Sequence, residues 1–174
     1  MKKCFKLFGL MLGVFSLCSL VLVGCGGGNK NCSNDLKLAT YSNTEANYSV
    51  NNEGVKLDCV GDNKFELSGS VAVANSKLIT DFGFQDNETH IVSLKLIANK
   101  EVEKDAFSLQ VKGPTKTNTF DKTALDGDNY TYLLLAVDAM TDDKCYEVTV
   151  KWNADDNGTT YTICKSKDLT LAKA

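Results

Sequence analysis

The chain has 174 residues, enough for one domain with a substantial core, and a net charge of −3 at pH 7. All 19 of its basic residues are lysines, which excludes the bidentate contacts that arginine makes with phosphate and guanine. An acidic chain also lacks the basic surface of nucleic-acid-binding proteins, so we expect no nucleic-acid partner.

The N-terminus has the layout of an export signal. Lys2, Lys3 and Lys6 form a positive start, and an uncharged run rich in leucine, valine and phenylalanine extends over 7–23. Uncharged sequence continues to Asn29, which is also long enough for a retained transmembrane helix. The residues at the end of the apolar run distinguish an export signal from a retained transmembrane helix.

These residues are Leu22, Val23, Gly24 and Cys25. They resemble the lipobox of bacterial prolipoproteins, which has an aliphatic residue three positions before an obligatory cysteine and a small residue directly before it. The resemblance implies cleavage between Gly24 and Cys25 and a lipid on the Cys25 thiol, which anchors the protein to a membrane of the cell envelope with its domain outside the cytoplasm. An ordinary secreted protein is the alternative, but there is no alanine before Ala39 to form its cleavage site.

We therefore divide the chain into a signal peptide (1–24), the lipidated cysteine with a flexible glycine-rich tether (25–34) and one domain (35–174). Loss of the three signal-peptide lysines lowers the net charge to −6. The domain contains no second linker and no internal repeat.

Apolar and polar residues alternate through most of this domain. The alternation covers 65–73, 90–98, 107–112, 146–152 and 161–163. Period-two alternation predicts strands with one buried and one solvated face.

Two further features complete the fold prediction. The stretch 130–137 is apolar on both faces, which predicts a central strand or a short helix. Turn-forming clusters separate the runs, and no convincing amphipathic helix is present. We predict an all-β, antiparallel β-sandwich, immunoglobulin-like, with a jelly roll or a β-barrel as alternatives. The cysteine and tryptophan spacing of true immunoglobulin domains does not match, because Trp152 lies in the penultimate predicted strand.

Seven cysteines occur, of which Cys4 and Cys18 leave with the signal and Cys25 takes lipid. Four cysteines remain, namely Cys32, Cys59, Cys145 and Cys164. An even number in an exported domain predicts two disulfides, and four buried free thiols are the alternative.

The position of two cysteines on the last predicted hairpin suggests the pairing. Cys145 begins one arm and Cys164 ends the other, with both side chains on the outer face. Pairing Val150 with Tyr161 would leave the two sulfurs diagonal, and a two-residue shift would bring them face to face. We predict the disulfide Cys145–Cys164, which leaves the other pair by elimination.

The sequence offers little catalytic machinery. His90 is the sole histidine, lies at the start of a predicted strand, and is expected at the surface or a sheet edge, away from any nucleophile. No two cysteines have zinc-knuckle spacing. Paired carboxylates could hydrolyse glycosides, but Glu66 and Glu147 lie on solvated faces and the aspartates gather in turns at 126–128, 142–143 and 155–156. We predict no catalytic residue and no cofactor.

The acidic turns raise the question of calcium binding. The segment 153–158 resembles the opening of an EF-hand loop, but the twelfth position is Cys164 instead of glutamate. A hairpin turn explains the segment better, and the same holds for 126–129, so we predict no metal ligand. Whether these turns bind calcium stays open.

Aromatic residues could form a sugar-stacking platform. Trp152, Tyr146 and Tyr161 share the apolar face of their strands, which predicts core packing. Tyr41 and Tyr48 lie in a polar stretch and are expected to be more exposed.

Together these features predict a monomeric, non-enzymatic surface module on a lipid tether, with an envelope protein or a glycan as partner. A carbohydrate or solute receptor is the alternative, although the domain is too small for two lobes that close over a ligand. A carboxylate-based glycoside hydrolase is the third reading. Strand edges and turn-rich ends are the expected docking surfaces.

Overall fold

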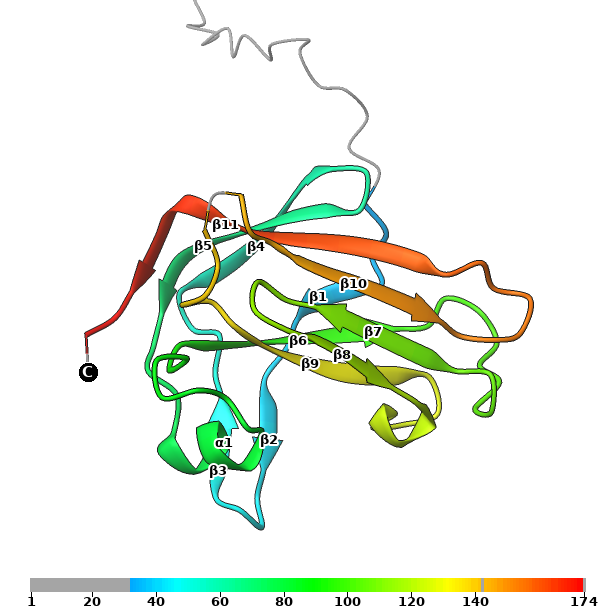
Figure 1. Ribbon diagram of the computed structural model, residues 1–174, viewed down its shortest axis with the longest axis horizontal. Helices are drawn as coiled ribbons and strands as arrows, with labels where there is room; N and C mark the ends of the chain where they lie inside the picture. The colour runs from blue at the N-terminus through cyan, green and yellow to red at the C-terminus, as the bar shows by residue number, and fades with distance from the viewer. Residues whose placement is uncertain (1–31, 142, 174) are drawn as a thin grey trace, which may run out of the picture.

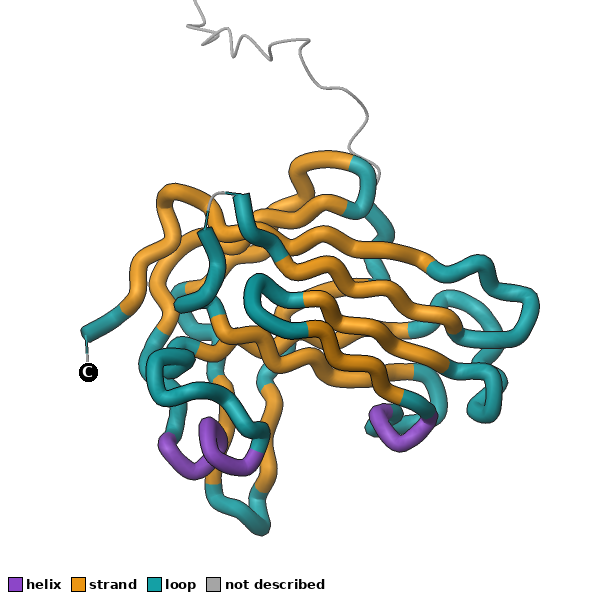
Figure 2. The backbone as a smooth tube through the Cα atoms, viewed as in Figure 1, coloured by secondary structure: helices purple, strands orange, loops and turns teal. Residues whose placement is uncertain are grey.

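The computed structural model describes residues 32–141 and 143–173, which fold into an all-β sandwich (Figures 1 and 2). The strands are β1 (Leu36–Leu38), β2 (Tyr41–Asn43), β3 (Tyr48–Val50), β4 (Val55–Gly61), β5 (Lys64–Val71), β6 (Ile91–Ile97), β7 (Ser108–Lys112), β8 (Thr117–Phe120), β9 (Tyr130–Ala136), β10 (Tyr146–Lys151) and β11 (Thr159–Leu171). The short helices are α1 (Ser76–Asp81) and the 3-10 turn η1 (Lys122–Ala124).

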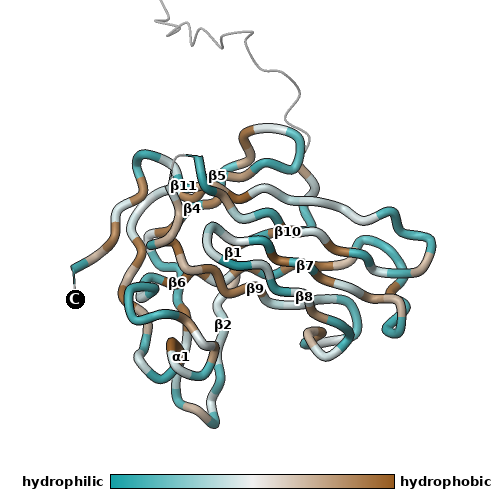
Figure 3. The backbone as a smooth tube through the Cα atoms, in the orientation of Figure 1, coloured by the Kyte–Doolittle hydropathy of each residue, from teal (hydrophilic) through white to brown (hydrophobic). Residues whose placement is uncertain are grey.

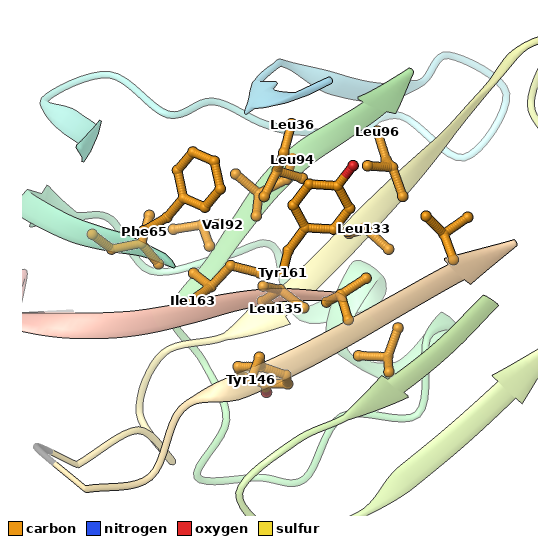
Figure 4. Packing of buried hydrophobic residues seen from close by; sticks show 14 of the residues in the cluster. Leu36, Phe65, Val92, Leu94, Leu96, Leu133, Leu135, Tyr146, Tyr161 and Ile163 are labelled. Carbon is orange, nitrogen blue, oxygen red and sulfur yellow. The ribbon is translucent and has the colours of Figure 1, made fainter. Parts of the chain in front are cut away.

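Two sheets form the sandwich. One has the strand order β1-β6-β9, and the other has the order β4-β5-β11-β10-β7-β8. A third sheet consists of the hairpin β2-β3 alone. Buried side chains from the inner faces of the two larger sheets meet in one core, as Figure 4 shows for Leu94 and Leu135 on one side and Tyr161 and Ile163 on the other.

The five alternating stretches are confirmed as strands. In β10, Tyr146, Val148 and Val150 are buried, whereas Glu147 and Lys151 are exposed. The same pattern recurs in β7 and in the first half of β11. Figure 3 shows the consequence along the chain, with hydrophilic residues gathered in the peripheral loops. The predicted sandwich is therefore confirmed, while its immunoglobulin-like topology stays a prediction.

The apolar stretch 130–137 forms strand β9, but its predicted central position is wrong because β9 is the edge of its sheet. Both of its faces are nevertheless covered. Leu133 and Leu135 point into the main core, while Leu134 and Ala136 belong to a second cluster with Tyr48 of β3 and buried Leu78 of α1. A small layer on the outer face thus explains why this edge strand lacks a polar side.

One strand pair departs from the antiparallel pattern. β11 runs antiparallel to β10 but parallel to β5, with Ile163 opposite Phe65 and Leu169 opposite Gly69. The register shifts between Lys165 and Leu169, where β11 bends. No convincing amphipathic helix was predicted, but the chain forms the short helix α1, whose N-cap is Asn75.

Both predicted disulfides are confirmed. Tyr146 pairs with Ile163 and Val148 with Tyr161, so the hairpin adopts the register that places Cys145 directly opposite Cys164. Their Cα atoms lie 4.5 Å apart. The second disulfide joins Cys32 to Cys59, with a Cα separation of 6.0 Å, and fastens the segment before β1 to β4 in the other sheet.

Candidate functional site

A cleft of about 480 Å³ opens along the free side of β9, between that strand and the inner face of β7 and β8. Such a volume is typical of sites that hold a small molecule. Leu133 and Leu135 of β9 form one wall, and Leu109 and Val111 of β7 form the other. Tyr146 of β10 lies at its base.

The inner face of β8 is left uncovered at this cleft. Asn118 and Phe120 are paired directly with Val111 and Leu109, so their side chains point to the same face as those two core residues. Both are nevertheless exposed, and 41% of Phe120 is accessible. The sandwich therefore has a core-facing surface on β8 that no described strand covers.

Aromatic rings extend the cleft around the edge of β9 to the outer side. Tyr41 of β2 packs edge-on against Phe82 and Tyr132, with ring centroids 5.7 Å and 5.4 Å apart. Phe82, just after α1, is 43% exposed, and Phe84 lies beside it in the same lining. Large apolar side chains at an open cleft are more informative than single exposed ones, because their exposure costs free energy that a ligand would recover.

Two carboxylates lie in the cleft. Glu88 is only 3% exposed, and its Oε2 accepts a hydrogen bond of 2.9 Å from the backbone N–H of Gln85. Burial, reinforced by the charge of Glu88, raises the pKa of Tyr146 to about 12. Asp126 is exposed and accepts a hydrogen bond of 3.2 Å from the backbone N–H of Tyr132. The lining thus combines aromatic and aliphatic side chains with polar ones, among them two acidic groups held by backbone donors.

One lysine spans the cleft mouth. Lys116, in the turn between β7 and β8, places its ammonium 3.5 Å from the carbonyl oxygen of Gly83 and 5.9 Å from the ring centroid of Phe84. In the part of the chain that the structure describes, no lysine ammonium lies within 4.0 Å of the Glu88 carboxylate. The buried carboxylate therefore has no resident counter-ion among those residues.

The predicted surface position of His90 is wrong. The residue is buried, its Nδ1 lies 2.7 Å from Asp138 Oδ1, and its Nε2 lies 2.8 Å from the carbonyl oxygen of Ala172. Its backbone N–H also donates to Asp138 Oδ2. His90 thus fastens the start of β6 to the residue after β11, a structural role that satisfies a buried polar side chain.

The acidic segment 153–158, before β11, forms a turn. Asp156 accepts hydrogen bonds from the backbone N–H groups of Trp152 and Gly158 and lies 3.2 Å from the Lys100 ammonium. Partial burial would raise the pKa of Asp156, but these partners outweigh it and lower the pKa. Among the described residues, no group of three or more histidine, cysteine, aspartate or glutamate side chains is placed to hold a metal ion.

The remaining predicted residues have mixed outcomes. Trp152 and Tyr161 are buried, as expected for core residues. The expected exposure of Tyr48 is wrong, since it packs beneath α1, whereas Tyr41 is half-buried in the cleft lining. Glu147 lies on a solvated face, 3.0 Å from Lys112.

Several cleft residues escaped the sequence analysis, namely Phe82, Phe84, Glu88, Asn118 and Phe120. The available signal was the presence of bulky aromatic residues in otherwise polar stretches, such as Phe120 after three polar residues. That signal marks exposed aromatic side chains but does not show that the fold brings them to one cleft.

Gly24, Cys25 and Asp142 lie outside the described residues. No helix in the described ranges has the length and apolar character needed to cross a membrane. Comparisons with protein-family models, with curated proteins and with solved structures give no match.

Proposed function

We propose that the chain is a lipoprotein of the bacterial cell envelope whose β-sandwich is a non-enzymatic binding domain. The observation that carries the proposal is the cleft beside β9, where Phe120 and Phe82 are exposed in a cavity that also contains placed polar groups. An apolar cavity with a few placed polar groups is the usual form of a binding site. The lipobox at Cys25 would hold this cleft outside the cytoplasm.

The polar groups near the cleft support binding over catalysis. Glu88 and Asp126 each accept a backbone hydrogen bond, so part of each carboxylate already serves the fold. Both ring nitrogens of His90 have partners in Asp138 and Ala172. His90 therefore has no free ring nitrogen to act as a general base, which needs a free nitrogen or oxygen within reach of a substrate.

A glycan is the second candidate ligand. Tyr41, Phe82 and Tyr132 present aromatic rings at the outer side of the cleft, and aromatic faces can stack on sugar rings. The core position of Trp152 argues against the alternative platform on the last hairpin.

Lipidation is tested by replacing the cysteine. We expect Cys25→Ser to leave unprocessed precursor, while the wild-type protein is cleaved before Cys25 and partitions into detergent. Two acyl chains at ~0.8 kcal/mol per buried CH₂ hold a protein firmly on a membrane. Intact-mass spectrometry provides the measurement, and a mature wild-type protein with an unmodified Cys25 would contradict lipidation.

Ligand binding in the cleft is tested by substitutions on β8. We expect Asn118→Trp to fill the cleft and to abolish binding of solubilised envelope proteins and glycans by the immobilised lipoprotein. The matched control is Thr119→Trp, because Thr119 is also exposed on β8 but its side chain lies on the opposite face and outside the cleft. Both surface changes should alter the free energy of unfolding by less than about 1 kcal/mol. Equal binding by the two variants would show that the cleft is not the site.

A further inference from the structure

The hydrogen bonds between β9 and β6 show which backbone groups of β9 point to its free edge. Val137 N–H donates to the His90 carbonyl, and Ala98 N–H donates to the Asn129 carbonyl. In an antiparallel pair this fixes the alternation, so the odd-numbered residues of β9 bond to β6 and the even-numbered ones direct N–H and C=O to the free edge.

Side chains and loops satisfy the two ends of this edge. At one end, Asp126 accepts from Tyr132 N–H and donates its own N–H to the Tyr130 carbonyl. At the other end, the Tyr146 hydroxyl donates to the Ala136 carbonyl. Between them, the N–H and C=O of Leu134 and the N–H of Ala136 have no hydrogen-bond partner among the described residues. A short ladder of backbone donors and acceptors therefore faces the cleft.

The cleft has walls on both faces of β9. Leu133 and Leu135 line it on the inner face, and Tyr132 and Leu134 line it on the outer face. A strand placed beside β9 would direct alternate side chains to the same two faces. Its inner side chains would cover Phe120 and the core-facing side of β8, and its outer side chains would meet the aromatic rings.

We propose that the cleft binds an extended segment of a partner protein, which adds as a fourth strand to the sheet β1-β6-β9 along the free edge of β9. This inference rests on the proposed binding function and names the class of ligand. Strand addition to an exposed edge draws affinity from main-chain hydrogen bonds and specificity from pockets for alternate side chains. The segment runs beside 132–136, about five residues of extended chain, and forms its main-chain hydrogen bonds with the free groups of Leu134 and Ala136.

Charge defines the ends of this segment. Asp126 lies at the Tyr132 end of the free edge, and Glu88 lies two residues before His90, whose carbonyl accepts from Val137 N–H at the other end. Acidic groups at both ends of an apolar cleft match a segment with alternating apolar residues and a basic residue at each end. Lys116 contacts Phe84 and the Gly83 carbonyl at the mouth, and among the described residues neither carboxylate forms an ion pair with a lysine.

A second copy of this chain fits less well than another protein. The glycine-rich segment 26–31 has no apolar side chain to cover Phe120 or Leu133. An edge strand of a folded copy is held on one side by its own sheet, which would have to enter the space between β9 and β8 together with that strand. The occupant is therefore an unpaired, extended segment of a different protein.

The test uses a blocked seven-residue peptide with valines at alternate positions, threonines between them and a lysine at each end. We expect saturable binding to the mature lipoprotein in detergent micelles, measured by fluorescence anisotropy, and its loss in Asn118→Trp but not in Thr119→Trp. A peptide with glutamate ends should bind about tenfold more weakly at low salt, because the carboxylates then repel it.

Backbone methylation distinguishes strand addition from other cleft binding. N-methylation of either all valines or all threonines should weaken binding about tenfold or more, and methylation of the other set should leave it nearly unchanged, because only alternate N–H groups face β9. Leu134→Pro and Leu134→Ala both remove the cleft-lining leucine, but only Leu134→Pro also removes a free N–H, at a sheet edge where proline is tolerated. Leu134→Pro should therefore bind the peptide about tenfold more weakly than Leu134→Ala.

The outcomes separate the two proposals. Equal effects of the two methylations, or no saturable binding of the peptide up to millimolar concentration, would overturn strand addition. If envelope ligands still discriminate Asn118→Trp from Thr119→Trp in that case, the proposed binding function stands. If neither the peptide nor any envelope component discriminates the two variants, both proposals fail.

Discussion

Trp152→Ala should lower the free energy of unfolding by about 3–5 kcal/mol, as large-to-small changes of buried aromatic residues do. Trp152 directly follows β10, is 1% exposed, and packs against Phe107 with ring centroids 5.4 Å apart. Truncation would leave a cavity between the end of β10 and the segment before β7, because the surrounding strands are held by their ladders and relax only in part. Urea unfolding followed by circular dichroism provides the measurement.

The matched control is Phe120→Ala. It removes a similar ring that is 41% exposed at the cleft, and the loss should be below about 1 kcal/mol. Similar losses in the two variants would contradict the core position of Trp152. A spectrum dominated by helix in the wild-type protein would contradict the sandwich itself.

The strand content was predictable because it is a local property. Each run of alternating residues has one apolar face, which is a pattern typical of strands. The predicted solvated face is wrong for β6, where Ser93 is fully buried. In β7, Leu109 and Val111 are buried while Gln110 and Lys112 are exposed, as the alternation indicates. The register of the last hairpin was less certain, since alternation permits shifts of two residues. The facing positions of Cys145 and Cys164 resolve that choice.

Sheet order was not predictable from local pattern. An apolar run such as 130–137 indicates burial on two faces but does not show whether another strand or a small layer supplies the second cover. Here the hairpin β2-β3 and α1 supply it, which leaves the edge of β9 open. The parallel pairing of β11 with β5 is likewise a long-range contact that no short segment specifies.

The cleft and the burial of His90 could not be predicted from the sequence, for the same reason. Glu88 and Phe120 come from different parts of the chain, and only the sheet order brings them to one cavity. His90 lies in a polar stretch, but Asp138 and the carbonyl of Ala172 converge on it from distant positions and make its burial favourable. The sequence supplied the residue types, whereas their spatial grouping required the tertiary fold.

Removal of either disulfide should cost about 3 kcal/mol of unfolding free energy. The bridged cysteines are separated by 19 residues in Cys145–Cys164 and by 27 in Cys32–Cys59. In the chain-entropy model the cost depends on the logarithm of the loop length, so these two loops differ by only a few tenths of a kcal/mol. Replacement of each pair by alanine, followed by urea unfolding, provides the measurement.

Removal of the two disulfides should nevertheless affect the folded state differently. Cys145 and Cys164 face each other in a hairpin whose strands stay paired along the whole ladder, so their removal should act almost entirely on the unfolded chain. Cys32 instead connects the segment before β1 to β4, across two sheets, and packs against the core. We therefore expect the Cys32→Ala/Cys59→Ala variant to lose more stability than its loop length predicts, with faster amide exchange in β1. A smaller loss in this variant than in Cys145→Ala/Cys164→Ala would contradict that role, and four reactive thiols in the denatured, unreduced wild-type protein would contradict both disulfides.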